Sequence, residues 1–273
     1  MPKACSPVIQ IAKYTLTDEV RQKSFIVMGV ICALAILLVR GCYSGNFMMN
    51  GQALHADTVI RLVSKVIFYM IAAGAMLLAA LLSMRVLKRD RDEGMQSCIL
   101  SKPITRRQYV AGKILGLWAL SVSFMFILHS IVFIMASINL KGVMPEYLLA
   151  SLLCSFNLLF VVVAVLLFSL LMPDIIAFLC VMGIGIASFV ADGIFSLSRS
   201  SMGQSGAASD LSGGKLVYYL WPKLSGIQQF ASSLIGGEGF QAFLSVYPFM
   251  NILIYVLILG ALLFWRFRNE DII

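Results

Sequence analysis

Six long apolar stretches constrain this chain more than any other feature of its sequence. The hydrocarbon core of a bilayer is about 30 Å thick, so a helix needs about 20 apolar residues to cross it. Runs of that length cover residues 24–43, 66–84, 114–137, 147–172, 175–198 and 243–265. Among 273 residues, 60% are hydrophobic and only 12% are charged, which lies outside the soluble globular range. We therefore predict an all-α integral membrane protein with six transmembrane helices and a single domain, 1–273.

The positions of lysine and arginine predict the orientation of these helices. About two thirds of the 21 basic residues fall in residues 1–23, 85–113 and 266–273. Short loops rich in lysine and arginine stay in the cytoplasm. We therefore place both termini in the cytoplasm of a bacterial inner-membrane protein. The formal charge of +8 arises mostly from this asymmetry, so it does not indicate nucleic-acid binding.

Residues for catalysis or metal binding are scarce in this chain. Only two histidines occur, His55 and His129, which excludes an H-E-x-x-H zinc motif, and no phosphate-binding loop is present. The six cysteines show no disulfide or metal spacing. Cys42 follows a weak match to a lipoprotein cleavage site, but an uncleaved first span fits better. We predict no enzymatic activity and no cofactor bound by this chain.

The segment 1–23 has the pattern of an amphipathic helix. Ser6 can cap its start and Pro7 suits the first helical turn. The apolar residues recur at helical spacing, at Val8, Ala12, Leu16 and Val20. Such a helix would lie along the cytoplasmic membrane interface. The alternative is an ordinary cytosolic helix that packs on a partner.

The segment 87–113 is the most polar predicted cytoplasmic element. It extends the second span through a charged run, and Gly94 then relaxes the backbone. Pro103 lacks an N–H donor and ends the helix. Thr105 and Gln108 form a T-x-x-Q capping box that starts the helix leading into the third span. The sequence predicts a helix, a break and a capped helix.

Two further connections can be read from composition. Pro173 and Asp174 alone join the fourth and fifth spans, which predicts a tight cytoplasmic hairpin. The outer loop 199–242 begins with a Ser/Gly-rich part, 199–214. Its second part, 216–235, is too short to span and too apolar for open solvent. We predict short interfacial or re-entrant helices there, before the last span.

Polar residues inside the spans are the candidates for a substrate path. They are His129, Asn157 and Asp192. An ionisable group in a membrane is a functional candidate by default. The alternative for His129 is a packed and hydrogen-bonded helix position, and Asp192 lies near the outer end of the fifth span, where water can reach it. The shortage of charge in the spans favours a lipid-like or amphiphilic cargo, or the transmission of movement.

The segment 87–113 also carries a family resemblance. Glu93 and Gly94, then Ser101-Lys102-Pro103-Ile104-Thr105-Arg106, and finally Lys113 resemble a pattern in type-2 ABC-transporter permeases, where S-x-P-[IV]-[ST]-R precedes the third span. The layout is similar to the subgroup named for multicopper-enzyme maturation and to gliding-type permeases. Met95 departs from the pattern, because the family commonly has threonine there.

This resemblance implies a homodimer, or a pair of related permeases, bound to two separate ATPase subunits that hold ATP and magnesium. The ATPase-coupling residues would be Asp92, Glu93, Gly94, Met95, Pro103, Ile104, Thr105, Arg106 and Arg107. The implied function is export of an amphiphilic, lipid or peptide substrate. Two alternatives stay open. The chain could pass force to an extracytoplasmic maturation protein, or it could be a membrane scaffold or immunity protein that transports nothing.

Overall fold

The chain folds into a bundle of long α-helices. The computed structural model describes residues 6–22, 25–27, 29–34, 48–49, 52–53, 56–95, 104–140, 145–199, 221–236 and 242–269. The helices are α1 (Pro7–Val20), α3 (Ala56–Asp92), α5 (Arg106–Leu140), α6 (Glu146–Leu171), α7 (Asp174–Arg199), α9 (Leu224–Gly236) and α10 (Ala242–Arg268). The predicted all-α membrane class is confirmed.

A very short β-hairpin precedes α3, and the sequence did not predict it. Strand β1 (Met48–Met49) pairs antiparallel with β2 (Gln52–Ala53), with Met48 opposite Ala53. Each strand has only two residues, so the hairpin is a minor addition to a helical fold and does not change the fold class.

Five helices among the described residues are long and apolar enough to cross a membrane. They are Val59–Asp92, Arg106–Asn139, Glu146–Leu171, Asp174–Ile194 and Tyr247–Arg268. These match the predicted second to sixth spans. The predicted first span, 24–43, lies mostly outside the described residues, although 25–27 and 29–34 are helical. The count of six therefore stays a prediction.

Helix α3 is much longer than a bilayer requires. It has 37 residues and hence a length of about 55 Å. Since the hydrocarbon core is about 30 Å thick, α3 must project well beyond it. The helix continues through the charged run to Asp92, as the sequence predicted for the extension of the second span.

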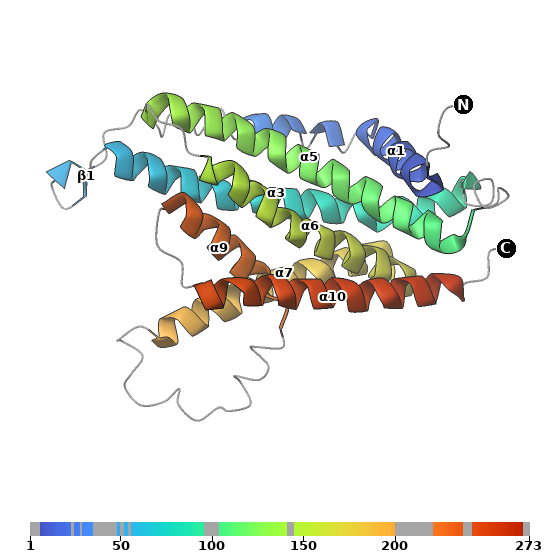
Figure 1. Cartoon of the computed structure of the whole chain (residues 1–273). Coiled ribbons are helices and arrows are strands. Elements are labelled where there is room, and N and C mark those ends of the chain that lie inside the picture. The colour runs from blue at the N-terminus through green and yellow to red at the C-terminus, as the bar shows by residue number, and fades with distance from the viewer. Residues whose placement is uncertain are drawn as a thin grey trace.

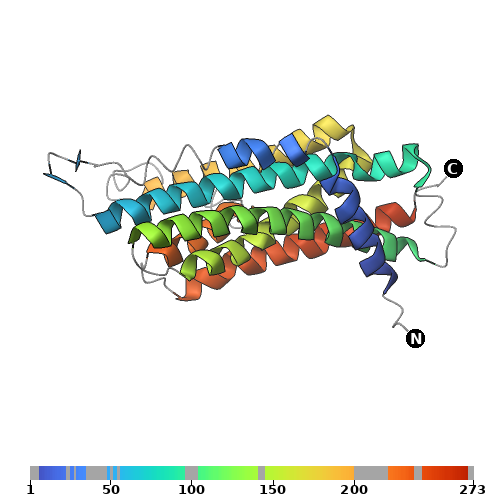
Figure 2. The same ribbon diagram turned by 90° about the horizontal axis from the view of Figure 1, so that it is seen from above.

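One end of the bundle gathers several segments that lie far apart in the sequence. Figure 1 places α1, the last turns of α3, the first turns of α5 and the last turns of α10 at this end. Figure 2 shows α1 crossing the long helices at a steep angle instead of running beside them. These segments are the ones predicted to be cytoplasmic, and we call this end the basic end. Its sidedness stays a prediction.

Helix α6 forms the centre of the bundle, in contact with α3, α5, α7, α9 and α10. Its residues from Phe160 to Leu167 are all buried. Helix α7, by contrast, leaves large apolar side chains exposed, such as Ile175, Leu179 and Ile194. Apolar residues on the outside are expected where lipid or another membrane helix covers the surface.

Helix α9 lies inside the bundle. Its first residues contact the middle of α6, where Asn157 Nδ2 donates to the carbonyl of Leu224 at 2.8 Å. Its other end reaches the start of α3, where Arg61 Nη1 donates to the carbonyl of Ile235 at 3.3 Å. Ile227 is fully buried. Residues 200–220 and 237–241 lie outside the described part, so the choice between an interfacial and a re-entrant helix stays a prediction.

The connection between α6 and α7 is as short as the sequence predicted. Helix α6 ends at Leu171, and α7 begins at Asp174. The amide of Ala177 donates to the carbonyl of Pro173 at 3.0 Å, which closes the first turn of α7. The carboxylate of Asp174 pairs with Lys88 at 3.7 Å, so this hairpin lies beside the end of α3.

Candidate functional site

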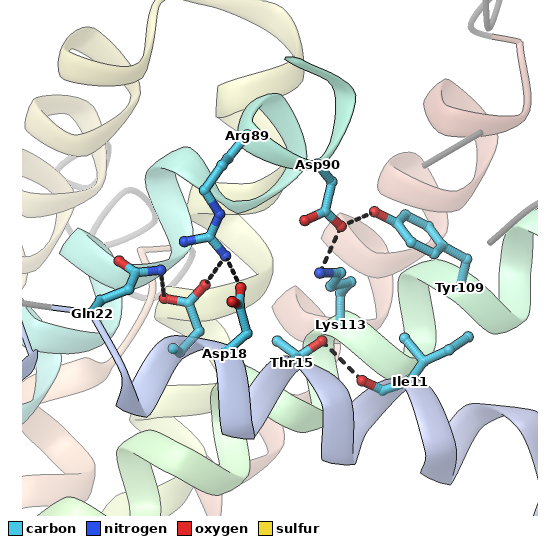
Figure 3. A network of polar contacts seen from close by, with 9 residues as sticks. Ile11, Thr15, Asp18, Gln22, Arg89, Asp90, Tyr109 and Lys113 are labelled. Carbon is cyan, nitrogen blue, oxygen red and sulfur yellow. Dashed lines mark hydrogen bonds and ion pairs between the residues drawn. The ribbon is translucent and has the colours of Figure 1, made fainter. Parts of the chain in front are cut away.

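An ion-pair network at the basic end joins α1 to α3. The guanidinium of Arg89 pairs with Asp18 and, at 2.7 Å, with Glu19 Oε1 (Figure 3). Gln22 Nε2 donates to the other oxygen of Glu19 at 2.6 Å. Arg89 stands at the end of α3, three residues before Asp92, so these contacts hold the crossing helix α1 against the predicted coupling element.

A second group joins α3 to α5 beside the first. Lys113 Nζ lies 2.6 Å from Asp90 Oδ2, and both side chains are buried. Tyr109 donates its hydroxyl to the same carboxylate oxygen (Figure 3). The ammonium of Lys113 also lies 5.6 Å from the ring centroid of Tyr14 on α1. Removing one partner of such a buried ion pair strongly destabilises the protein, because the other partner is left as a buried charge with no opposite charge beside it.

Helix α1 lies directly on the backbone of α5 at two glycines. A Cβ added to Gly112 would stand 2.7 Å from the side chain of Ile11. A Cβ added to Gly116 would stand 2.8 Å from the carbonyl oxygen of Ala12 and from Thr15. The spacing is G-x-x-x-G, which lets membrane helices approach closely. The sequence analysis did not use this signal.

Helix α1 packs on the bundle through Ile11, Thr15 and Glu19, which are buried, whereas Val20 of the predicted apolar stripe is exposed. Glu19 reaches Arg89, and the hydroxyl of Thr15 donates to the carbonyl of Ile11 at 2.9 Å. The predicted cap at Ser6 is wrong, because its side chain makes no capping bond. The position of α1 at the membrane interface stays a prediction.

Burial affects the titration of two α1 side chains at this site. Desolvation raises the pKa of Glu19 above its ordinary value, although the positive charge of Arg89 acts in the opposite direction. Desolvation also raises the pKa of Tyr14, and the nearby carboxylates of Asp18 and Asp90 add to that increase. The α1 surface facing the bundle is therefore a partly dehydrated, charged contact.

The last residues of α3 form the first half of the predicted coupling element. Asp92 and Glu93 are exposed, and Met95 is half-buried. Gly94 has φ of +69°, a left-handed conformation that glycine adopts without strain. Its amide donates to the carbonyl of Arg91 at 3.0 Å. The backbone relaxation predicted at Gly94 is thus present, but α3 already ends at Asp92, before the end predicted at Pro103.

The start of α5 forms the second half. The amide of Thr105 donates to Gln108 Oε1 at 3.0 Å, and the amide of Gln108 donates to Thr105 Oγ1 at 3.3 Å. This is the reciprocal capping box that the sequence predicted. Ile104 packs against the hydrophobic core. The predicted break at Pro103, with residues 96–103, lies outside the described residues.

The two arginines that follow take different positions. Arg106 Nη1 donates to the backbone carbonyl of Arg268 at 2.9 Å, which ties the start of α5 to the end of α10. Arg107 is exposed. The structure therefore brings the described coupling candidates to one end, with Asp92, Glu93 and Arg107 on the surface.

The three candidates for a substrate path do not form one site. His129 is buried among aromatic rings, stacked on Phe68 at 4.6 Å between centroids, and its Nδ1 lies 2.8 Å from Ser151 Oγ. Asn157 and Asp192 both meet the start of α9. Asp192 Oδ1 lies 3.1 Å from Lys223 Nζ.

The contact with α9 contains residues that the sequence analysis did not select. Asp192 also accepts a hydrogen bond from the hydroxyl of Ser225. Ser188 donates to the carbonyl of Pro222 at 2.9 Å, and the amide of Lys223 donates to Asn251 Oδ1 at 3.0 Å. In the sequence, Lys223 is one basic residue of the predicted outer loop 199–242. No local pattern links it to Asp192, because the two lie on separate elements.

Within the described ranges, no group of three or more histidine, cysteine, aspartate or glutamate side chains could hold a metal ion. The polar residues at the basic end are instead paired across helices. Their arrangement suits mechanical connection between α1, α3 and α5.

The fold and this site define a multi-pass helical membrane protein with a crossing helix tied to the polar ends of two long spans. The family model for ABC-2 family transporter proteins matches residues 9–272, nearly the whole chain. The chain belongs to this family, as its resemblance to type-2 ABC permeases predicted. The narrower subgroup stays a prediction. No curated protein matches the chain.

Proposed function

We propose that this ABC-2 family protein is the permease subunit of an exporter, driven by two separate ATPase subunits. The observation that carries the proposal is the network of Arg89, Asp90 and Lys113 behind the segment 92–107. These residues connect α1, α3 and α5 at the point where two spans meet the predicted coupling element. A partner that pushes on this element would therefore move three helices together.

The exposed residues of the element supply the contact with the ATPase. Asp92 and Glu93 offer negative charge, and Arg107 offers positive charge, all at the surface. Gly94, Ile104 and Thr105 set the backbone through a left-handed turn, a core contact and a helix cap. We assign the first group to recognition and the second to rigidity. Bistable packed elements transmit such movements better than deformable loops do.

The cargo we propose is amphiphilic, a lipid or a peptide, carried by a pair of permeases. Asp192 and Lys223 form an ion pair with each other, and the ring of His129 stacks on Phe68. The exposed apolar side chains of α7, such as Leu179 and Ile186, leave a surface for a second permease or for lipid. These features favour an apolar path over one lined with ionisable groups.

The test is co-purification of the ATPase subunits with the full chain, together with ATP hydrolysis by the complex. Reversing the charge of Glu93 and Arg107 together should lower both ATPase retention and hydrolysis by about tenfold or more, since each lost charge-assisted contact is worth about 1.5–3 kcal/mol. Glu146→Lys is the matched control, because Glu146 is exposed at the start of α6, away from the element.

The control should retain the ATPase at the unmodified level. Full retention and full hydrolysis in the Glu93 and Arg107 variant would refute the coupling role. Purification of the chain with no ATPase at all would favour a membrane scaffold.

A further inference from the structure

A groove of about 580 Å³ opens between α5 and α10 at the basic end, and Val8 of α1 completes its lining. Its α10 wall consists of Ala261, Phe264, Trp265 and Arg268, which share one helix face because they are three, four and seven residues apart. Its α5 wall includes Arg107 and Ala111, one turn apart. The two alanines leave the space that larger side chains would fill.

The charged residues among the described lining of the groove are both arginines, and they lie at one end. Arg107 stands in the first turn of α5, and Arg268 is the last residue of α10. Both are exposed, and among the residues that the structure describes no carboxylate lines the groove. The first turn of α5 contains no acidic residue, although the N-terminus of a helix favours negative charge. This end of the groove therefore attracts an external anion.

Apart from Gln108, the remaining wall is apolar and extends along α10 away from the two arginines. From Ala261 to Arg268 the groove extends about 10 Å along α10. Trp265 is 63% exposed and lies between the apolar part and Arg268. Exposed tryptophans of membrane proteins are enriched at headgroup level. A phospholipid in the groove would thus place its acyl chain on Ala261 and Phe264, its interfacial part beside Trp265 and its phosphate at Arg268.

The groove is fixed in shape by contacts beside it. The bond from Arg106 to the carbonyl of Arg268, at 2.9 Å, holds the start of α5 at the end of α10. The rings of Tyr109 and Phe267 stack with centroids 5.7 Å apart at the same junction. The groove is already formed before a ligand enters. Binding therefore does not have to include the entropic cost of ordering the groove, which favours affinity.

We propose that this groove binds one anionic phospholipid from the leaflet at the basic end. The lipid phosphate lies between the guanidinium groups of Arg107 and Arg268, and an acyl chain packs against Ala111, Ala261 and Phe264. Basic pockets between membrane helices recognise anionic headgroups in this way. The lipid is a bound component of the permease, and the proposal does not depend on an ATPase partner.

The experiment is native mass spectrometry of the purified full chain, titrated with phosphatidylglycerol and with phosphatidylcholine of the same acyl chains. We expect one phosphatidylglycerol to be retained with at least tenfold preference. Arg107→Gln and Arg268→Gln should each reduce this preference about fivefold. Arg21→Gln is the matched control, because Arg21 is an exposed arginine at the same end and does not line the groove.

A second pair of variants tests the groove itself. Ala111→Phe with Ala261→Phe keeps both arginines and fills the apolar part, so the bound lipid should be lost. Arg107→Lys with Arg268→Lys should retain most of the preference, which shows that the arginine variants do not act through misfolding. Soluble glycerol phosphate should not compete, because it lacks the acyl chain.

Three results would overturn the proposal. Equal retention of phosphatidylcholine would show that charge is not recognised. Undiminished lipid binding to the variant with Ala111→Phe and Ala261→Phe would show that the lipid is held by general attraction to the basic surface and not by the groove. Disulfide cross-linking between two copies of Ala261→Cys in native membranes would show that a second copy of the chain occupies the groove.

Discussion

Asp90 and Lys113 form an ion pair in the protein interior, with Nζ 2.6 Å from Oδ2 and side-chain exposures of only 3% and 0%. Asp90 lies two residues before the exposed end of α3, and Lys113 lies two turns into α5. Because this pair spans the two helices that flank the segment 92–107, it fixes the distance between them. Charged side chains near the end of a membrane-spanning helix normally extend into water. The burial of Asp90 and Lys113 therefore indicates that the pair has a structural role.

Replacing one partner of this pair should destabilise the protein more than replacing both partners. Asp90→Asn leaves the ammonium of Lys113 buried without a counter-charge, and we expect a loss of about 3–5 kcal/mol. Asp90→Asn with Lys113→Met should cost less than the sum of the two single changes. Tyr109→Phe, which removes one hydrogen bond to the same carboxylate, should cost about 1.5–3 kcal/mol. Thermal unfolding in detergent measures all four; additive single effects would contradict a direct coupling.

The close packing of α1 on α5 predicts opposite signs for two kinds of glycine substitution. Gly→Ala within a helix normally stabilises by about 1 kcal/mol. Gly74→Ala should do so, because no atom lies within 4 Å of its added Cβ. Gly112→Ala and Gly116→Ala should instead lower the melting temperature, since their Cβ atoms would meet α1 at 2.7 and 2.8 Å.

The same glycine variants should also loosen α1 from the bundle. Faster proteolysis between α1 and the first predicted span would report this change, and Gly74→Ala serves as the control. If Gly112→Ala raised the melting temperature as Gly74→Ala does, α1 would not lie against α5 in the membrane.

Local sequence patterns predicted the boundaries of α6, α7 and α10 to within three residues, whereas α3 begins ten residues before the predicted start of the second span. The expected span 147–172 differs by one residue at each end from α6, Glu146–Leu171. Thr105 and Gln108 form the expected capping box, because both bonds act within a single turn. Such features depend on neighbours in the chain, so they can be recognised without any tertiary information.

Contacts between distant residues were not predictable in this way. Arg89 meets Asp18 and Glu19, which are 71 and 70 residues away, and its position in the sequence predicts only the sidedness of its segment. Lys223 meets Asp192 across 31 residues. The position of a charge indicates which side of the membrane a loop prefers, but it does not identify the carboxylate that it will meet.

The pair of Asp192 and Lys223 predicts how α9 is held. Asp192→Asn should destabilise the protein by about 1.5–3 kcal/mol, because it removes the carboxylate charge 3.1 Å from the ammonium of Lys223. Asp192→Asn with Lys223→Met should recover part of that loss. Melting temperature measures stability, and transport of a candidate cargo is assayed beside it. Reduced transport with unchanged melting temperature would contradict the anchoring role and would support the predicted role of Asp192 in a substrate path.

The pKa of Glu19 predicts a pH dependence for the docking of α1. Burial raises this pKa in the folded protein, whereas the unfolded value is about 4.3. Between these two values the folded state binds more protons than the unfolded state, so the contribution of Glu19 to stability falls as pH rises through that window. It is fully present below about pH 4.3.

Glu19→Gln isolates this effect, because glutamine keeps the shape and does not titrate. Melting curves of both proteins between pH 4 and pH 8 give the difference at each pH, and other titrating groups cancel. We expect the unmodified protein to gain stability relative to Glu19→Gln as the pH is lowered. A relative loss on acidification would mean that the ion pair with Arg89 outweighs burial, and that the pKa of Glu19 is lowered instead.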